Sequence, residues 1–189
     1  MGNYTVIADV GLALVKLLRD RLCPDVIRLP DNIGLCAPSD RGDLVLGLHL
    51  YDIREKRELR ANRMRSEGID QQRWPSLYLS LSYMVTAYSK ADLKFRAEDN
   101  QRILGKVIEV FRDEAVLSTD LLTPGNRGAG LDLHVEMINP NMEEQRKIWN
   151  VSEQAYQTSL FYEVSPVELE STRTRRIQRV VDADLGVKE

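Results

Sequence analysis

The sequence is poor in the residues that build disulfide scaffolds and metal centres. Its 189 residues include two cysteines and two histidines. Cys23 and Cys36 form no Cys-x-x-Cys pair, so we expect no disulfide framework, and folding in a reducing compartment is compatible with the sequence. A metal site needs several converging ligands, and the one imaginable group, His49 with Cys36 and Asp52, has no recognised spacing. His134 lies on a different predicted strand, so we expect neither a metal nor a cofactor.

A large net charge and a long apolar run are also missing. The chain has 26 basic and 29 acidic residues, a net charge of −3, so as a whole it has no electrostatic attraction to nucleic acid or anionic lipid. The apolar N-terminal stretch has no basic segment before it and is interrupted by Asp9, Lys16 and Arg19, so neither a signal peptide nor a membrane span is expected. The myristoylation motif at Gly2 fails because position 6 is Val6.

Sequence motifs for phosphate binding and catalysis are absent as well. The nearest glycine-rich stretch, residues 125–130, lacks the Lys-Ser/Thr pair of a phosphate-binding loop and opens no predicted helix. Cys23 has no neighbouring group in the sequence that would activate its thiol. No pair stands out among the 29 acidic residues. We therefore expect no catalytic residue, although a small enzyme with a scattered site stays open, and a deep pocket with strongly perturbed carboxylates would reveal it.

The strongest pattern present is a strand followed by a helix between residues 77 and 111. Mostly apolar residues occupy the odd positions from Leu77 to Ala87, and polar, small or amphipathic residues occupy the even ones. This period of two predicts one buried face and one face at least partly exposed to water. The helix starts near Ser89–Asp92 or nearer Ala97, and its apolar face contains Ile103, Leu104, Val107, Ile108 and Phe111. We expect this pair to organise the fold.

A wide apolar stripe predicts another helix over residues 4–22. Its main stripe consists of Ile7, Val10, Leu14, Leu17, Leu18 and Leu22. Leu12 and Val15 lie beside this stripe and widen it, and a wide stripe is typical of a helix that is buried on two sides. Two interpretations stay open for these two residues: burial within the chain, or a contact between subunits.

Two further segments complete the first half of the predicted sheet. Residues 23–42 contain three prolines and two glycines, which indicate connecting structure with a short strand at 33–37. Residues 43–53 predict a strand with leucines on one face and Val45, His49, Tyr51 and Ile53 on the other. Apolar side chains on both faces indicate that this strand is covered on both sides.

The second half of the chain predicts two more strands and a short helix. Residues 131–137 alternate as a strand, and Asn139–Asn141 break it and cap a helix over 142–151. Residues 158–171 predict the last strand. The apolar positions of this strand slip by one after Pro166, so we expect a bulge or kink there, on an edge of the sheet. The residues from 173 onward are polar, and we expect them to be poorly ordered without a partner.

Two basic clusters are the only features with a functional character. The first cluster consists of Arg54, Lys56, Arg57, Arg60, Arg63 and Arg65, and the second of Arg173, Arg175, Arg176 and Arg179. Each is compatible with a solvated loop, a protein-docking surface or a nucleic-acid-binding arm. Segment 54–65 lacks interleaved aromatic residues for base stacking, and the chain is acidic overall, which disfavours the third interpretation. The second cluster, after a possible edge strand, could also prevent stray strand pairing.

Several stretches, taken in order, resemble the cap or tail-terminator proteins of extracellular contractile injection systems. These are phage-tail-like particles of the antifeeding-prophage and virulence-cassette type. The resemblance covers roughly residues 4–171, and its motifs are structural rather than catalytic. The matching stretches are residues 7–10 (IADV), 45–54 (VLGLHLYDIR), 75–89 (PSLYLSLSYMVTAYS), 102–107 (RILGKV) and 160–164 (LFYEV).

The resemblance implies a fold and a function. The expected fold is α+β: a single tail-terminator-like cap domain over residues 1–171, with a mixed, mostly antiparallel sheet and helices packed on it, then a polar tail over 172–189. The expected function is a ring, a homohexamer, that sits on the distal end of the inner tube and sheath, stops their polymerisation and stabilises the particle. The expected partners are other copies of the chain, the tube protein and the sheath protein.

The resemblance leaves no role for a small-molecule substrate, a nucleic acid or a membrane, and it implies that the chain is not an enzyme. Assembly is expected in the cytoplasm, into a particle that is either kept or released from the cell. Candidate interface residues are the two beside the helical stripe and eight arginines from the basic clusters. They are Leu12, Val15, Arg54, Arg57, Arg60, Arg63, Arg65, Arg173, Arg175 and Arg176.

Overall fold

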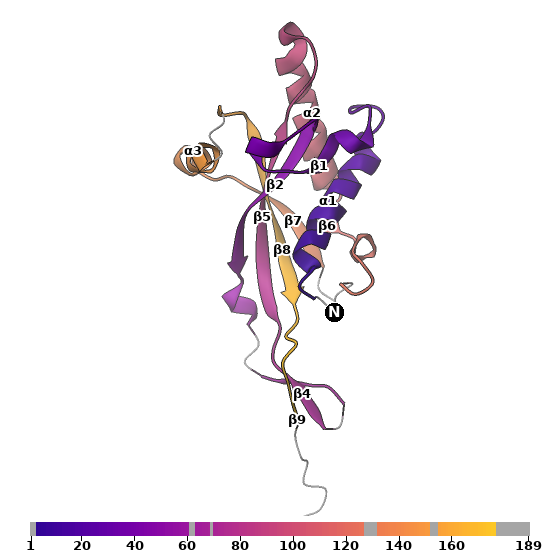
Figure 1. Ribbon diagram of the computed structural model, residues 1–189, viewed down its shortest axis with the longest axis vertical. Helices are drawn as coiled ribbons and strands as arrows, with labels where there is room; N and C mark the ends of the chain where they lie inside the picture. Colours follow the sequence, from indigo (N-terminus) through magenta and orange to yellow (C-terminus); the bar gives the residue numbers. More distant parts are fainter. Residues whose placement is uncertain (1–2, 61–62, 69, 127–131, 152–154, 177–189) are drawn as a thin grey trace, which may run out of the picture.

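A six-stranded sheet runs along the length of the molecule, with helices on both of its faces (Figure 1). The structure is a computed structural model, and it describes residues 3–60, 63–68, 70–126, 132–151 and 155–176. Strand order is β1-β2-β5-β8-β7-β6. Only β1 and β2 pair in parallel, so the sheet is mixed and mostly antiparallel, as the family resemblance implies.

The strands of this sheet differ greatly in length, and the longest lie at its centre. The central strands β5 and β8 are flanked by shorter ones, so both edges of the sheet are short. The strands are β1 (Ile33–Leu35), β2 (Leu46–Glu55), β5 (Leu77–Ala87), β6 (Val116–Leu117), β7 (Leu133–Ile138) and β8 (Ser159–Leu169). Single-turn 3₁₀ helices occur in the connections at Pro30–Asn32, Pro38–Asp40, Arg57–Leu59 and Thr119–Leu121.

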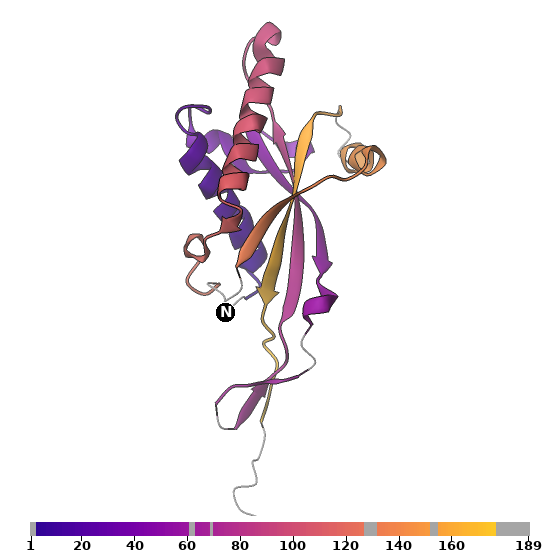
Figure 2. The ribbon, with the colours of Figure 1, turned by 180° about the vertical axis from the view of Figure 1, so that it is seen from behind.

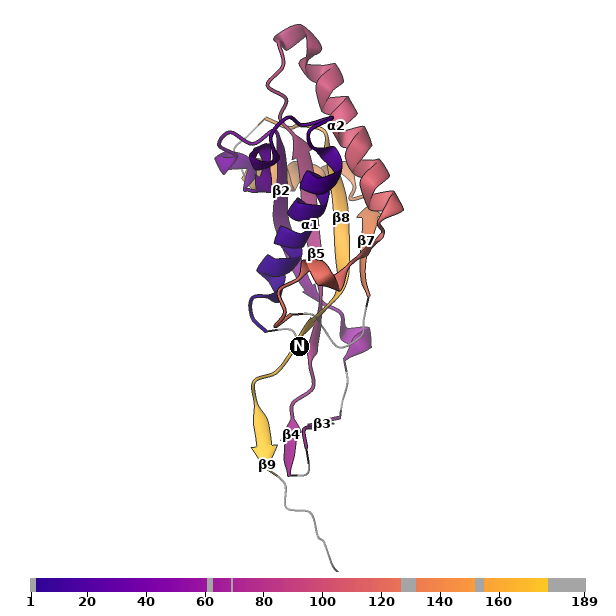
Figure 3. The same cartoon turned by 90° about the vertical axis from the view of Figure 1, so that its right-hand side faces the viewer.

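Two helices cover one face of the sheet and build the main core. Figures 2 and 3 show α1 (Val6–Leu22) and α2 (Leu93–Asp113) together on this face. Leu14 and Leu18 of α1 are at most 1% exposed, and Val107 of α2 is fully buried. The first half of α2 extends beyond the sheet, and its buried residues begin at Ile103. Apolar residues at helical spacing thus place both helices where the sequence predicts them.

The opposite face carries the third helix, α3 (Met142–Val151). Asn141 caps it, because its Oδ1 accepts hydrogen bonds from the backbone N–H groups of Glu143 and Glu144, both at 3.0 Å. Trp149 of α3 is 2% exposed and packs with Met84, Tyr88 and Phe161 in a second, smaller core. The predicted cap and helix at this position are confirmed.

Strand β5 is buried on both faces, which corrects one expectation. The even positions Ser80, Ser82, Met84 and Thr86 are each at most 6% exposed rather than partly wet. The strand lies between β2 and β8 in the middle of the sheet, and α3 helps to cover its second face. The Thr86 hydroxyl meets the Ser159 hydroxyl at 2.7 Å, so a polar residue is accommodated there by a cross-strand hydrogen bond.

Strand β8 contains the predicted bulge but is not an edge strand. Val167 pairs with Leu79 and Val164 with Leu81, so two residues of β8 face one residue of β5. Pro166 is tolerated because β7 pairs with β8 only as far as Ser165, and beyond that point no other strand of the described residues pairs with this side of β8.

Two details near the strand ends also differ from expectation. Strand β2 is buried only at Leu46–Leu48, where β1 pairs with it, and its last residues are exposed rather than covered on both sides. Asp92 occupies the N-cap position of α2 without a side-chain capping bond. Ser89, near which the sequence places the start of this helix, donates its hydroxyl to Asp99 within α2, so Ser89 and Asp92 form no capping box.

A second, three-stranded sheet extends from one end of the molecule, opposite the projecting end of α2 (Figure 3). It consists of β3 (Arg65–Ser66), β4 (Gln71–Arg73) and β9 (Thr174–Arg176), all antiparallel. We call residues 57–76 and 170–176 the basic tip. Because β9 pairs with β4, the expectation of poor order is wrong for Thr174–Arg176, while residues 177–189 and Arg179 lie outside the described residues.

Candidate assembly surfaces

The two apolar candidates on α1 have different environments. Val15 is 4% exposed and belongs to the main core, so its side chain packs within the chain. Leu12 is 58% exposed on the outer surface of the same helix. Of the pair, Leu12 is therefore the one available to a second molecule, and its part in a subunit contact stays a prediction.

An apolar groove lies beside Leu12, between α1 and the strands β1 and β2. It has a volume of about 520 Å³, and Tyr4, Ile7 and Leu35 are among the residues that line it. Tyr4 is 86% exposed and Leu35 is 42% exposed. Leu12 is one helical turn after Ala8, another lining residue, so it extends the same apolar surface along the helix. The sequence pattern did not single out Tyr4 and Leu35.

The floor of this groove contains a buried hydroxyl. Tyr83 is 1% exposed, and its OH has no hydrogen-bond partner among the residues that the structure describes. A Cβ atom at Gly11 would come within 3.3 Å of this OH and within 3.1 Å of the Leu35 side chain. Glycine at position 11 therefore lets α1 approach the sheet closely. Burial raises the pKa of Tyr83, which keeps the phenol neutral.

The basic tip brings together residues from both basic clusters of the sequence. Arg63, Arg65, Arg173, Arg175 and Arg176 are all exposed there. Arg175 and Arg176 of β9 pair in register with Gln72 and Gln71 of β4. Two segments that are about a hundred residues apart in the sequence thus form one surface rich in guanidinium groups.

Arg73 connects the two segments of the basic tip through ion pairs. Its Nε donates to Glu67 at 2.9 Å, and its Nη1 donates to Glu170 at 3.0 Å. The Glu170 side chain is 9% exposed, so this ion pair is partly shielded from water. On the next residue, the Trp74 ring carries the Arg173 guanidinium 4.0 Å from its centroid. The sequence singles out Arg173 but not Arg73, Trp74 or their partners, because β4 reads Gln-Gln-Arg and has no apolar alternation.

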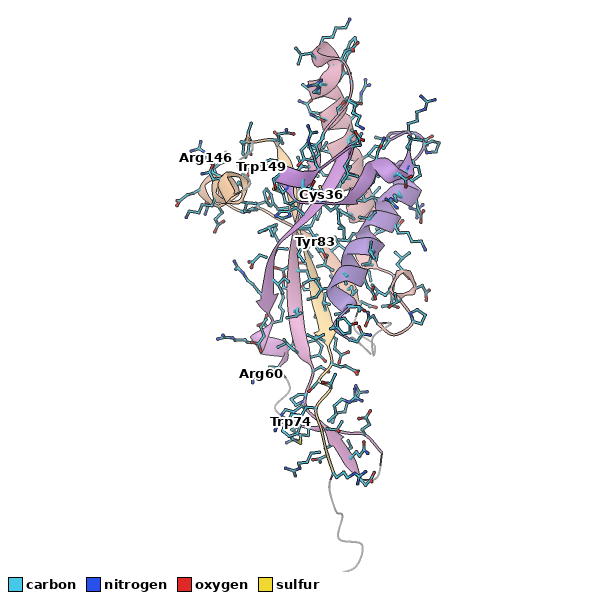
Figure 4. All side chains as sticks on the ribbon, viewed as in Figure 1. Cys36, Arg60, Trp74, Tyr83, Arg146 and Trp149 are labelled. Atoms are coloured by element: carbon cyan, nitrogen blue, oxygen red, sulfur yellow. The ribbon has the colours of Figure 1, made fainter. Side chains whose placement is uncertain are left out.

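The other three candidate arginines lie at the end of β2 and in the turn after it, where the basic tip begins. Arg54 donates to Asp52 at 2.6 Å, and Arg57 lies 3.9 Å from Glu55. Their side chains are 79% and 85% exposed, so these pairs are well solvated and add little stability. Arg60, which follows the Arg57–Leu59 turn, is also exposed (Figure 4). Of the first basic cluster, Arg54 therefore belongs to the large sheet, and Arg57, Arg60, Arg63 and Arg65 belong to the basic tip.

The residues considered for metal or nucleophilic chemistry lie in unremarkable environments. Burial lowers the pKa of His49 and raises the pKa values of the Cys23 and Cys36 thiols. A raised thiol pKa reduces the thiolate fraction that nucleophilic attack requires. His134 is exposed on β7. The described residues hold no cluster of three or more His, Cys, Asp and Glu side chains suited to a metal ion.

A polar cavity on the α3 side has a volume of about 470 Å³, and Asp52, Glu144 and Glu163 contribute to its lining. Burial alone would raise the pKa of Glu163, but hydrogen bonds from Lys56, Ser80 and Ser165 lower this pKa overall. Lys56 Nζ lies 2.9 Å from this carboxylate. A lowered pKa with a structural ion pair differs from the raised pKa that a buried general acid needs.

Comparison with known proteins identifies the family of this chain. The sequence profile described as "Pvc16 N-terminal domain" matches residues 9–183, nearly the whole chain. The chain belongs to the Pvc16 N-terminal domain family. A search of the curated proteins finds no match for this Pvc16 N-terminal domain. Among the described residues, no helix is long and apolar enough to span a membrane.

Two of the solved structures that resemble this chain share its fold. One is the PVC sheath/tube terminator of an extracellular contractile injection system in its extended state, with a TM-score of 0.69 and 17% identity. The other is the tube-terminating cap of the anti-feeding prophage, with a TM-score of 0.65 and 18% identity. The matches cover 100% and 95% of this chain but 65% and 61% of those chains. The predicted α+β, tail-terminator-like fold is confirmed.

Proposed function

We propose that this chain is a structural cap that ends the inner tube and sheath of a contractile injection particle. The observation that carries the proposal is the likeness of its whole fold to a sheath/tube terminator and to a tube-terminating cap, together with the family match. The cap acts by shape: one side fits the end of the tube and sheath, and the other side offers no surface for a further layer. It breaks no covalent bond.

In this proposal the chain forms a closed ring of six copies and contacts the tube and sheath proteins. A cyclic ring needs two different complementary surfaces on each subunit. The apolar groove with Leu12 supplies one candidate, because exposed apolar surface beside a helix is typical of an interface. The ring assembles in the cytoplasm and becomes part of a phage-tail-like particle. Nucleic acid, membranes and small-molecule substrates have no part in it.

The open edges of the large sheet offer a second kind of contact. β1 pairs with β2 only at Leu46–Leu48, and no other strand among the described residues pairs with the outer edge of β2 beyond that point. Free backbone groups on such an edge can pair with an extended segment of another protein. A strand from the sheath protein, added at this edge, would connect the cap to the last sheath layer.

Deletion of the chain tests the proposal. We expect a deletion strain to produce tubes and sheaths of uncontrolled length, or unstable particles, and the restored chain to return the normal length, as measured by electron microscopy.

Leu12→Ser should weaken ring formation in sedimentation experiments. The matched control is Leu29→Ser, because Leu29 is also exposed, at 56%, but lies in the connection after α1 rather than on the helix beside the groove. Particles of normal, defined length in the deletion strain would contradict the proposal.

A further inference from the structure

The basic tip carries an unusual concentration of one side-chain type. Residues 57–76 and 170–176 contain eight arginines, no lysine and four acidic residues, a net charge of +4. In a chain of net charge −3, the remaining residues therefore carry −7. We infer that the basic tip docks onto a carboxylate-rich protein surface at the end of the particle. This inference rests on the proposed function and names the chemistry of one of its contacts.

The small sheet of the basic tip has no hydrophobic core of its own. Strands β3, β4 and β9 contain only Arg, Ser, Gln and Thr residues, and β3 and β9 are fully exposed. A sheet this small needs an apolar face or a packed neighbour to be stable alone. In the isolated chain, Arg73 and its two glutamates hold it in place. Such a sheet gains its missing burial when a partner covers it.

The tip also keeps like charges together at a cost. Arg65 of β3 lies directly opposite Arg73 of β4, and like charges at opposed positions destabilise a strand pair. Glu67 neutralises Arg73, and no ion pair of Arg65 is found among the described residues. A residue that destabilises its own strand pair in this way is expected where the residue has a functional role, such as binding a partner. Arg65 thus joins Arg175 and Arg176 as guanidinium groups available to an external carboxylate.

The structure favours a protein partner over a nucleic acid. Guanidinium groups bind carboxylates and phosphates alike, so the surroundings must decide. Arg173 already occupies a face of the Trp74 ring, the aromatic of the basic tip that could stack on a base. Over the rest of the chain, whose residues carry a net charge of −7, a long polyanion that reached past the tip would meet repulsion. A local acidic patch avoids that repulsion, since charges beyond about 8 Å are screened at physiological salt.

The position of the tip suits such a contact. It lies at one end of the long axis, away from α2 and α3, so it can reach a neighbour without moving the body (Figures 1 and 3). Arginine pairs with carboxylates through two parallel hydrogen bonds, which fixes the orientation as well as the charge. A ring of such tips would hold each subunit of the cap in a defined orientation on the particle end.

The experiment uses particles purified from a strain that lacks this chain, to which the purified full-length protein is added. Binding is measured by cosedimentation, and electron microscopy shows where the protein sits. We expect the variant Arg65→Glu/Arg175→Glu/Arg176→Glu to bind at least about tenfold more weakly, because each close charge pair is worth 1.4 kcal/mol or more. The control Arg28→Glu/Arg112→Glu/Arg146→Glu makes the same change in net charge at exposed sites elsewhere and should bind normally.

Two further measurements sharpen the test. Replacing the same three tip arginines by lysine keeps the charge but removes the paired hydrogen bonds, so an intermediate loss of binding is expected. Binding of the unmodified chain should also weaken as salt is raised from about 50 to about 300 mM. Unchanged thermal melting of the glutamate variant shows that its loss of binding is not a loss of folding.

Each other outcome identifies a different failure. If the glutamate variant binds particle ends as well as the unmodified chain, the docking inference is wrong and the cap function stands. If the unmodified chain does not bind particle ends at all, the proposed function fails. A short DNA duplex that binds as tightly as the particles, and only through the tip arginines, would assign the tip to nucleic acid. Self-association that is lost with the same arginines would assign it to a second copy of the chain.

Discussion

A buried carboxylate connects the start of α1 to a loop far along the chain. Asp9 is 8% exposed, and its Oδ2 accepts a hydrogen bond from Thr123 Oγ1 at 2.5 Å and another from Asn126 Nδ2. Asn126 is 1% exposed and also accepts from the backbone N–H of Asn3 at 2.8 Å. These bonds fix the loop before residue 127 against the first turns of α1, beside the groove that contains Tyr4.

We expect Asp9→Ala to lower the free energy of unfolding by about 1–3 kcal/mol. The substitution leaves the Asn126 amide and the Thr123 hydroxyl without their partner, and an unpaired buried polar group costs about that much. Urea unfolding followed by circular dichroism measures the change. Asp20→Ala, at an exposed position of the same helix, should have little effect. Equal stability of the two variants would show that the network adds nothing to folding.

Two buried tyrosines should make the free energy of unfolding depend on pH in the alkaline range. Tyr83 and Tyr162 are 1% and 3% exposed, and burial raises the pKa of Tyr162 to about 12 and raises that of Tyr83 as well. An unfolded tyrosine titrates near pH 10. Above that pH the folded chain keeps protons that the unfolded chain has lost, so the free energy of unfolding falls as the pH rises, by up to about 1.4 kcal/mol per tyrosine per pH unit.

The variant Tyr83→Phe/Tyr162→Phe should flatten this decline between about pH 10 and about pH 12. Near neutral pH, Tyr83→Phe should leave stability unchanged or raise it by about 1 kcal/mol, because the Tyr83 hydroxyl has no protein partner in the described structure. Chemical unfolding at several pH values measures both effects. Tyr4→Phe is the control, since Tyr4 is 86% exposed, and a slope that it alters equally would rule out burial as the cause.

At the scale of helices and strands, the sequence predicts best where one face is apolar. Periodic burial placed α1, α2, β5 and β8 within a few residues of their observed bounds. It misplaced the environment of β5, because a period of two identifies the core face but does not reveal that α3 covers the other face. It missed β3, β4 and β9 altogether, because these strands bury no apolar side chain and are held by ion pairs between distant residues.

The helix α3 offers a test of how one element is fixed. The side chain of Asn141 caps it, and Glu144 Oε2 accepts a hydrogen bond from the Asn141 backbone N–H at 3.1 Å, a reciprocal capping box. We expect Asn141→Ala to lower the free energy of unfolding by about 1 kcal/mol, whereas Asn141→Asp should retain the cap. Fluorescence of Trp149, buried beneath this helix, reports the unfolding in a Trp74→Phe background.

Asn141→Ala and Asn141→Asp could both have the same unfolding midpoint as the wild-type chain. That result would mean that α3 is held by the packing of Trp149 and not by its cap. The same fluorescence separates that case from a local loosening. If only the last turns of the helix detach, the Trp149 signal should change before the far-ultraviolet circular dichroism of the rest of the chain.

On the scale of the whole molecule, the fold divides into a packed body and a polar extension. The two apolar cores draw on α1, α2, α3 and the large sheet, and neither contains a residue of the basic tip. The sequence could predict the body because burial leaves a periodic pattern. It could not predict that two arginine clusters meet, since the tip depends on the path of the chain after β2 and β8, and the strands of the tip have no apolar alternation.

This division predicts that the body folds without the tip. Strands β2 and β5 are antiparallel neighbours, and the backbone N–H of Lys56 donates to the carbonyl of Tyr78 at 2.8 Å. A two-residue Asn-Gly turn can therefore replace residues 57–77 and connect Lys56 to Tyr78. In the same variant the chain ends after Leu169, which removes the rest of the basic tip. Lys56 and its ion pair with Glu163 are retained. We expect this shortened chain to melt within about 5 °C of the full chain, because both cores are intact.

The shortened chain should nevertheless fail to restore particle length in the deletion strain. Its apolar groove, Leu12 and the open edge of β2 are unchanged, so any self-association through those surfaces should persist in sedimentation experiments. The loss would then belong to attachment at the particle end and not to folding or ring closure. If the shortened chain did not fold, the ion pairs of Arg73 would have to support the body as well as the tip. If it folded and still limited particle length, capping would depend on the body alone and the tip arginines would be dispensable.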